Sequence, residues 1–439
     1  MKTTFSKIAL LISASLATTS GLFAADFQIH DGDRVVFLGD SITEQRLYTT
    51  YIEAYTLTRH PDWNLHFRNV GWGGDTAWLR QRSHPDEKTL FAAGEAEQQK
   101  MVFQSVYRGL ERDVLPLKPT FVTIKFGMND HSYQAFREDI FKAYVRSQEE
   151  LGKVLEANGA RVAYLTPQPI EDKRPDPDKD IKNLSLRKFS DGLHTVAGKV
   201  HGTFVDQFDP YMAIMMKART INPEAVIGGG DSVHPGPIGH TVMAWAVLKG
   251  LGASALVSSA DLNAAAKKLN AAENCQIENL SFADGSVSFD RLDQALPMPI
   301  DPKAAEALKL APITDELNRY EIKITGLPEG RYEISVDGDI LGHVTGEALA
   351  KGHNLGANLG PITAQSQQVL KLVFDKNNQF FNRWRNVQLA NLPGWAQGPE
   401  LEVKRAAEVA RLDQEIGVVE KQIDSLRKPK KHHFVIKHQ

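Results

Sequence analysis

Cysteine is nearly absent from this 439-residue chain, in which Cys275 is the only one. A single cysteine cannot form an intrachain disulfide, so the fold must rest on its apolar core and its hydrogen bonds. Free cysteine is among the most buried residue types, and no helper group is identifiable near Cys275. We therefore interpret Cys275 as a small apolar core residue and not as a nucleophile.

The chain also lacks a large excess of charge of either sign and any long apolar run in its main part. A net charge of −3 gives no electrostatic footprint for nucleic acid. Beyond residue 24 no stretch of about 18 apolar residues exists, so we predict no transmembrane segment. No internal repeat is present, and the sequence makes no prediction of an oligomeric partner.

Residues 1–24 have the features of a secretory signal peptide. Lys2 and Lys7 lead into the apolar run Ile8-Ala9-Leu10-Leu11-Ile12, and the segment ends in Leu22-Phe23-Ala24. A basic start, a short apolar stretch and a small residue at the end are the three parts that such a signal needs. The sequence therefore predicts cleavage after Ala24 and a soluble product that is secreted or periplasmic.

The chain exceeds the length at which one core usually stops growing, so we expect more than one structural unit. Residues 25–256 form the first domain. In this part, short runs rich in Val, Ile and Phe alternate with amphipathic stretches such as 136–155 and 184–200. Apolar strands of this kind are typical of a parallel sheet that is covered on both faces, which predicts an α/β doubly wound domain. The expected strands are 35–38, 65–70, 121–126, 162–165 and 203–205.

The remaining residues differ in character. We interpret 257–274 as a connector, 275–398 as a β-rich accessory region, 399–427 as an amphipathic helix and 428–439 as a solvent-exposed basic tail. Alternating runs with turn residues between them indicate antiparallel strands in the accessory region. The helix carries one apolar stripe, which is too short for typical coiled-coil pairing and favours packing within the chain. The stripe consists of Val409, Leu412, Ile416, Val419, Ile423 and Leu426.

A serine and a distant histidine could form a nucleophile and its base. Ser41 follows an apolar strand in Gly39-Asp40-Ser41-Ile42, where a strand-to-helix junction would present its hydroxyl and its own N–H at the same spot. Asp231 and His234 are three residues apart, so the carboxylate can reach Nδ1 and leave Nε2 free to face Ser41. In isolation, each pattern has an ordinary alternative: a common Gly-Asp-Ser turn, and a helix N-cap beside a surface histidine.

Two further segments follow expected strands and offer N–H donors for an oxyanion. Gly74 suits a backbone that approaches a ligand closely, and Asn129 carries a side-chain amide. The glycine-rich block Gly71-Trp72-Gly73-Gly74 leaves Gly73 and Gly74 as alternative donors. An ordinary glycine turn and an Asx-turn are the competing interpretations. Asp40 and Asp130 have the pattern of structural carboxylates that bind loop N–H groups.

Because ligands bind beyond the carboxyl ends of parallel strands, these segments should converge on one rim. The charged, proline-rich loop 167–180 leaves the fourth strand at that rim, and it either borders the cleft or is a solvated connection. Trp72, Trp78 and Tyr133 are candidates for a stacking surface for sugar rings, with ordinary packing as the alternative.

In this order the four blocks resemble the SGNH hydrolases, also called the GDSL esterase family, over residues 34–252. The resemblance implies a flavodoxin-like three-layer fold with the nucleophile at Ser41, the Asp–His pair at Asp231 and His234, and oxyanion donors at Ser41, Gly74 and Asn129. Residue 42 is Ile where the family motif has Leu, which exchanges one apolar residue for another. The β-rich accessory region resembles C-terminal regions beside such domains in secreted bacterial esterases.

These observations predict a serine esterase that needs no metal or organic cofactor and that acts on short acyl esters, above all O-acetyl groups on carbohydrate. The substrate partner would be an acylated small molecule or polysaccharide. Alternatives are a broad lipid esterase or lysophospholipase, and a catalytically inactive carbohydrate-binding protein. A metal-dependent phosphoesterase would need a denser set of His and Asp ligands than Asp40, Asn129, Asp130 and His234 provide.

Overall fold

The computed structural model describes residues 26–439 except 174–175, 284, 392–393 and 395–397. The expected signal peptide, residues 1–24, lies outside the described residues. None of the helices in the described part is long and apolar enough to cross a membrane.

A five-stranded parallel sheet forms the centre of the N-terminal domain, with the strand order β2-β1-β3-β4-β5. This order is that of flavodoxin-like sheets, so the predicted fold class is confirmed. All five strands lie where the sequence predicts them, and β3 is buried along its whole length because helices cover both faces. The strands are β1 (Arg34–Gly39), β2 (His66–Asn69), β3 (Phe121–Lys125), β4 (Arg161–Leu165) and β5 (Thr203–Val205).

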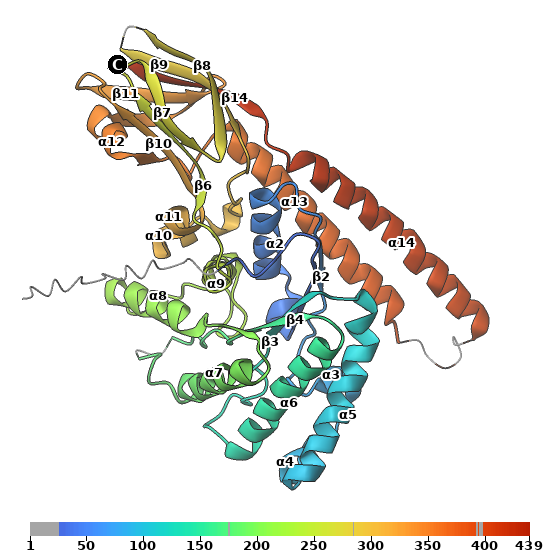
Figure 1. Ribbon diagram of the computed structural model, residues 1–439. Helices are drawn as coiled ribbons and strands as arrows, with labels where there is room; N and C mark the ends of the chain where they lie inside the picture. Colours follow the sequence, from blue (N-terminus) through green and yellow to red (C-terminus); the bar gives the residue numbers. More distant parts are fainter. Residues whose placement is uncertain (1–25, 174–175, 284, 392–393, 395–397) are drawn as a thin grey trace, which may run out of the picture.

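Successive residues of a strand point to opposite faces of the sheet, and the two faces belong to different cores. Phe37 of β1 packs with helices α2 (Leu47–Arg59), α8 (Phe208–Ile221) and α9 (Pro237–Gly250). Its neighbours Val36 and Leu38 pack on the other face, with α5 (Glu95–Asp113), α6 (Glu138–Ala157) and α7 (Ile181–Lys199). The domain therefore has three layers (Figure 1). Short helices lie in the connections: α1 (Ser41–Glu44), α3 (Arg80–Ser83), α4 (Glu87–Ala92) and η1 (Leu115–Leu117).

Two further sheets pack face to face in the C-terminal part. Tyr320, Ile322, Phe289 and Phe434 are fully buried between them. The four-stranded sheet has the order β13-β10-β6-β7, and the five-stranded sheet has the order β12-β11-β14-β9-β8. Their strands are β6 (Leu256–Asn263), β7 (Lys268–Glu273), β8 (Cys275–Ala283), β9 (Ser286–Asp293), β10 (Arg319–Thr325), β11 (Arg331–Val336), β12 (Asp339–Thr345), β13 (His353–Asn354) and β14 (Lys431–His438).

Two segments differ from their sequence interpretation. The expected connector 257–274 forms β6 and β7, because Val257 and Leu262 of β6 belong to the buried core of the sandwich. The expected exposed tail 428–439 contains β14, a central strand between β11 and β9. Phe434 and Ile436 are fully buried, and the residues on either side of each of them are exposed or half-buried. The charges dominate the composition of the tail, but the alternation decides its structure.

The region 275–398 is not wholly β-rich, because it also contains the long helix α13 (Pro361–Phe381), which continues as a π-helical turn, η3 (Asn382–Gln388). Shorter helices are η2 (Pro302–Ala304), α10 (Ala307–Leu310), α11 (Ile313–Leu317) and α12 (Gly346–Lys351). Cys275 is buried and its thiol donates to the Ser259 carbonyl, as expected for a core residue.

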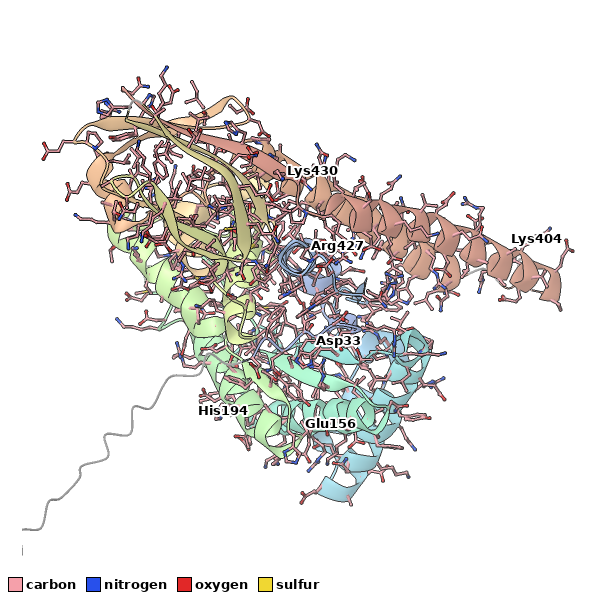
Figure 2. All side chains as sticks on the ribbon, turned by 45° about the horizontal axis from the view of Figure 1, so that its top comes forward. Asp33, Glu156, His194, Lys404, Arg427 and Lys430 are labelled. Carbon is pink, nitrogen blue, oxygen red and sulfur yellow. The ribbon has the colours of Figure 1, made fainter. Side chains whose placement is uncertain are left out.

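Helix α14 (Pro399–Leu426) lies where the sequence predicts an amphipathic helix, and it packs beside α13 (Figure 1). Leu412, Ile416 and Ile423 of its apolar stripe are buried, so the stripe packs within the chain. The chain then returns to the sandwich as β14: Arg427 and Lys430 lie at this return, whereas Lys404 lies near the opposite end of the helix (Figure 2). Helix α13 also packs against α2 of the N-terminal domain, which joins the two parts.

Candidate active site

The first site residue lies where β1 meets α1. Asp40 caps this helix by accepting a hydrogen bond from the N–H of Ile42 at 3.0 Å, and Ser41 is the first helical residue. A Cβ on Gly39 would lie 2.7 Å from the carbonyl oxygen of Lys125, so only glycine lets β1 end this close to β3. The junction holds Ser41, which is half-buried, at the carboxyl edge of the sheet.

The structure brings His234 to Ser41 from 193 residues away, with Ser41 Oγ and His234 Nε2 2.8 Å apart. The other ring nitrogen, Nδ1, lies 3.1 Å from Asp231 Oδ2. Asp231 Oδ1 accepts from the backbone N–H groups of Val233 and His234 at 2.7 and 2.6 Å, which fixes the carboxylate within its turn. Partial burial alone would raise the pKa of Asp231, but these N–H groups and the imidazole outweigh it and hold the pKa below its ordinary value.

The loop that carries His234 is held by residues that sequence reasoning missed. The buried Glu171 carboxylate accepts from the N–H groups of Gly228, at 2.7 Å, and Ile227. Its own N–H donates to the Ser232 carbonyl at 2.8 Å. In addition, Gln168 donates from its side-chain amide to the Val233 carbonyl at 3.0 Å. Burial raises the pKa of Glu171, and the backbone N–H groups oppose that shift.

These contacts decide between the two interpretations of loop 167–180. Its first part, through Glu171, is buried against the histidine loop, so this part borders the site and is not a solvated connection. The only signal for it in the sequence was the position of the loop after a strand at the carboxyl edge.

The segment with the two candidate oxyanion donors is a β-turn over Trp72–Asp75, closed by a hydrogen bond from the Asp75 N–H to the Trp72 carbonyl at 3.0 Å. Gly74 has a φ of +75°, which is typical of the third residue of a type II turn and favours glycine. The N–H of Gly73 donates to Glu44 Oε2 at 2.9 Å, whereas no acceptor is found for the Gly74 N–H among the described residues. Of the two alternative donors, Gly74 is therefore the one that is free.

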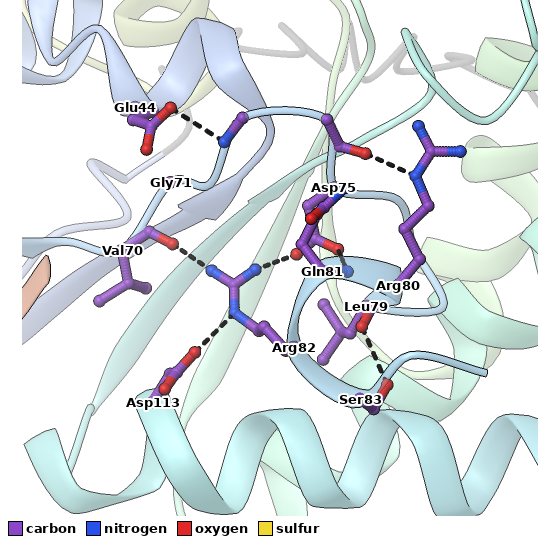
Figure 3. Close-up of polar contacts among 12 residues, drawn as sticks. Glu44, Val70, Gly71, Asp75, Leu79, Arg80, Gln81, Arg82, Ser83 and Asp113 are labelled. Carbon is purple, nitrogen blue, oxygen red and sulfur yellow. Dashed lines mark hydrogen bonds and ion pairs between the residues drawn. The ribbon is translucent and has the colours of Figure 1, made fainter. Parts of the chain in front are cut away.

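A buried arginine fixes the position of this turn (Figure 3). Arg82 forms ion pairs with Asp75 and with Asp113, the latter at 3.0 Å, and it also donates to the Val70 carbonyl. The side chains of all three charged residues are fully buried. Arg80 donates from Nε to the Gly74 carbonyl at 2.6 Å. These contacts thus hold the turn on both sides of Gly74. The direction of the Gly74 N–H is therefore fixed before any ligand binds.

Asn129 is the remaining candidate for an oxyanion donor. One hydrogen of its side-chain amide is donated to the Asp75 carbonyl at 2.9 Å, and its Oδ1 accepts from the Tyr133 hydroxyl at 3.0 Å. These two contacts set the direction of the amide and leave its second N–H for a ligand. Tyr133 thus touches a site residue, and burial raises the pKa of its phenol to about 12, so it remains a neutral donor.

Trp72 and Trp78 do not form the exposed stacking surface that the sequence allows. Trp78 is buried, with its indole N–H donated to Glu87 at 2.7 Å, so the alternative interpretation as a packing residue holds. Trp72 is half-buried and its ring is covered by the guanidinium of Arg385, whose carbon lies 3.3 Å from the ring centroid. Tyr133 alone of the three is exposed.

The two aspartates next to the motif residues bind loop N–H groups, as their pattern indicates. Asp40 caps α1, and Asp130 accepts from Ala77 at 2.8 Å and from Gly127 at 2.9 Å. Burial raises the pKa of Asp130 to about 7 although these N–H groups lower it. Over the described part of the chain, His, Cys, Asp and Glu side chains form no group of three or more that could hold a metal ion.

Comparison with known proteins gives three results. A model of the GDSL-like lipase/acylhydrolase family matches residues 37–242. An acetylxylan esterase from Geobacillus stearothermophilus is 22% identical in an alignment of 253 residues that covers 51% of this chain and 96% of that protein. A solved structure of a gut microbial diltiazem-metabolizing enzyme is 25% identical with a TM-score of 0.76, over 94% of this chain and 98% of the other. That similarity includes the C-terminal sandwich and helices as well as the α/β domain.

Proposed function

Residues 37–242 make this chain a member of the GDSL-type SGNH hydrolase family and a serine hydrolase of carboxylic esters, and we propose that it removes short acyl groups, above all O-acetyl groups, from carbohydrate. The observation that carries the catalytic assignment is the chain of contacts from Ser41 Oγ through His234 to Asp231. We further propose that the protein is secreted or periplasmic, on the strength of the signal-like residues 1–24.

In the proposed reaction Ser41 Oγ attacks the ester carbonyl while His234 Nε2 takes the hydroxyl proton. Asp231 holds the imidazole through Nδ1 and stabilises its cationic form. The developing oxyanion receives N–H groups from Gly74, from Asn129 and from Ser41 itself. His234 then returns the proton to the leaving alkoxide. Water, activated by the same imidazole, attacks the acyl-enzyme and releases the acid and Ser41.

A preference for short acyl groups is supported by the polarity of the residues around Ser41. Glu44 lies on the same short helix as Ser41 and binds the Gly73 N–H, and Asn129 and Tyr133 contribute an amide and a phenol. A long acyl chain requires a continuous apolar groove, which such groups do not provide. The carbohydrate part of the proposal is supported by the similarity to an acetylxylan esterase.

A panel of esters tests the proposal. We expect p-nitrophenyl acetate to be cleaved faster than the octanoate and dodecanoate esters, and acetate to be released from acetylated xylan and xylo-oligosaccharides. Ser41→Ala and His234→Ala should lower both rates at least about 10³-fold with unchanged unfolding curves. Near-normal turnover by His234→Ala would show that the base is assigned wrongly.

The other outcomes separate the alternatives. Rates that rise with acyl length, together with cleavage of a lysophospholipid, would indicate a lipid esterase. Binding of acetylated oligosaccharide without any burst from p-nitrophenyl acetate would indicate an inactive binding protein.

A second candidate substrate class is favoured by the similarity over nearly the whole chain to a gut microbial diltiazem-metabolizing enzyme. Action on a small acylated molecule would use the same Ser41 and His234. Diltiazem therefore belongs in the panel. A higher kcat/KM for diltiazem than for every acetylated oligosaccharide would favour this second class.

A further inference from the structure

The C-terminal region reaches the oxyanion turn through the π-helical turn η3 at the end of α13. Trp384 of η3 is buried and meets the ring of Trp72 edge to face, with centroids 5.8 Å apart. Next to it, the Arg385 guanidinium lies over the same ring, with its carbon 3.3 Å from the centroid. Isolated π-helical turns occur frequently at functional sites, because the extra residue changes the direction of the side chains.

Glu44 connects Arg385 to the site. It lies on α1, the one-turn helix that begins with Ser41. Its Oε1 is 3.6 Å from Arg385 Nη2, and its Oε2 accepts the Gly73 N–H at 2.9 Å. The two side chains are only 22% and 25% exposed, so solvent screens this ion pair less than an ordinary surface pair. One carboxylate therefore joins the helix that begins with Ser41, the turn with Gly73 and Gly74, and η3 at the end of α13.

The position of Glu44 matters for the direction of the neighbouring N–H group. Gly73 and Gly74 are the two central residues of the turn, and Glu44 engages the first N–H while the second stays free. A Cβ on Gly73 would lie 2.8 Å from Glu44 Oε2 and 4.0 Å from Ser41 Cβ, so the turn is in close contact with both residues. If Glu44 moved, this glycine pair would lose a contact that limits its conformations.

A second contact holds the other end of the nucleophile segment. Arg46 donates from Nε to Asn378 Oδ1 of α13 at 3.2 Å, and its guanidinium lies over the Phe381 ring. Arg46 also donates to the Glu44 carbonyl at 2.6 Å, so it holds the backbone of Glu44.

We propose that Arg385 is a positioning residue of the esterase: it holds the Glu44 carboxylate on the Gly73 N–H, and so keeps the Gly74 N–H directed at the oxyanion. The oxyanion hole of this protein is then completed by a side chain outside residues 37–242. The inference rests on the proposed ester hydrolysis but not on the identity of the natural ester.

A purely structural role for Arg385 would affect folding or packing and leave the transition state alone. The test therefore compares kcat, KM and the affinity of a boronic acid, which forms a tetrahedral adduct with the serine that resembles the transition state. The variants are Arg385→Met and Arg385→Lys. The matched control is Arg383→Met on the same turn, whose guanidinium pairs with Asp413 of α14 at 2.8 Å and not with the site.

For Arg385→Met we expect kcat for p-nitrophenyl acetate to fall about 10-fold to 100-fold, with KM within about twofold, because a misdirected donor acts on the transition state. Boronic acid affinity should fall by the same factor as kcat/KM. Arg385→Lys should recover part of the loss, since an ammonium pairs with Glu44 but lacks the planar stacking on Trp72. Arg383→Met should retain the wild-type kcat.

Glu44→Ala gives an independent measure if Arg385→Met folds poorly. It should lower kcat by a similar factor, and the double variant should lose no more than either single variant, because both act through one contact. A kcat and a boronic acid affinity in Arg385→Met and Glu44→Ala equal to those of Arg383→Met would overturn the inference. A wild-type protein without any turnover of p-nitrophenyl acetate would instead refute the proposed function, and this inference with it.

Discussion

Lys376 of α13 and Glu53 of α2 form an ion pair across 323 residues of sequence, with both side chains almost fully buried. The Glu53 carboxylate also accepts from the side-chain amide of Asn377 at 2.9 Å, and the Lys376 ammonium donates to the Phe67 carbonyl at 3.2 Å. A buried charge needs such partners, because water no longer solvates it. Helix α13 is therefore an integral part of the α/β domain and not an appended module.

Removing one partner of this ion pair should lower the free energy of unfolding more than replacing both partners by apolar residues. We expect Lys376→Met to lower the free energy of unfolding by about 3–5 kcal/mol, because it leaves the Glu53 charge buried and unpaired. The double variant Glu53→Leu with Lys376→Met should recover most of that loss, since two apolar groups need no partner. Urea unfolding followed by circular dichroism measures both. A double variant less stable than Lys376→Met would contradict this account.

Removal of Arg82 from its ion pairs should destabilise the fold by a similar amount. Arg82→Met leaves Asp75 and Asp113 buried without their shared cation, and we expect a loss of about 3–5 kcal/mol in the free energy of unfolding. Arg112→Met is the matched control: Arg112 also pairs with Asp113 but is 38% exposed, and Arg82 still pairs with the Asp113 carboxylate in this variant, so the loss should be smaller than in Arg82→Met. Equal losses in the two variants would show that burial does not decide the contribution.

Asn129 should act on the transition state and not on substrate binding. We expect Asn129→Ala to lower kcat for p-nitrophenyl acetate about 10²-fold to 10³-fold with little change in KM, as for other lost oxyanion donors. Tyr133→Phe should cost less, because it removes only the hydroxyl that orients the Asn129 amide. Steady-state kinetics measures kcat and KM separately. A change confined to KM in Asn129→Ala would point to a role in binding.

His60 gives a test of stability against pH. It stacks on the rings of Trp63 and Phe27, and burial, with a smaller effect of Arg59, lowers its pKa to about 4. The unfolded chain binds a proton at this histidine near pH 6.5, whereas the folded chain does so only near pH 4. The contribution of neutral His60 to the free energy of unfolding is therefore fully present above about pH 6.5. It is lost as the pH falls toward 4, with a slope of up to about 1.4 kcal/mol per pH unit.

His60→Phe keeps the stacking and removes this titration. The wild type should lose stability relative to His60→Phe between about pH 6.5 and 4, while the difference between them stays constant above pH 6.5. Chemical unfolding of both proteins at a series of pH values measures this difference in the free energy of unfolding. A difference that does not change between pH 7 and 4.5 would mean that His60 titrates alike in both states.

The sequence by itself determined the parallel sheet and the segments at its carboxyl edge. Strands buried on both faces appear as short apolar runs, and the chain just after each run must lie at the same edge. This local rule led to Ser41, Gly74 and Asn129, and residue chemistry added Asp231 and His234 as a carboxylate with its imidazole.

Only the tertiary structure decided which residues hold that site in place. Glu171, Arg82 and Arg385 act through contacts with distant segments, and a charged residue has no local pattern that distinguishes such a contact from solvent exposure. The same reason explains β14, whose Lys and His residues suggest an exposed tail until its neighbours β9 and β11 bury Phe434 and Ile436. The composition of a strand does not determine which distant strand it pairs with.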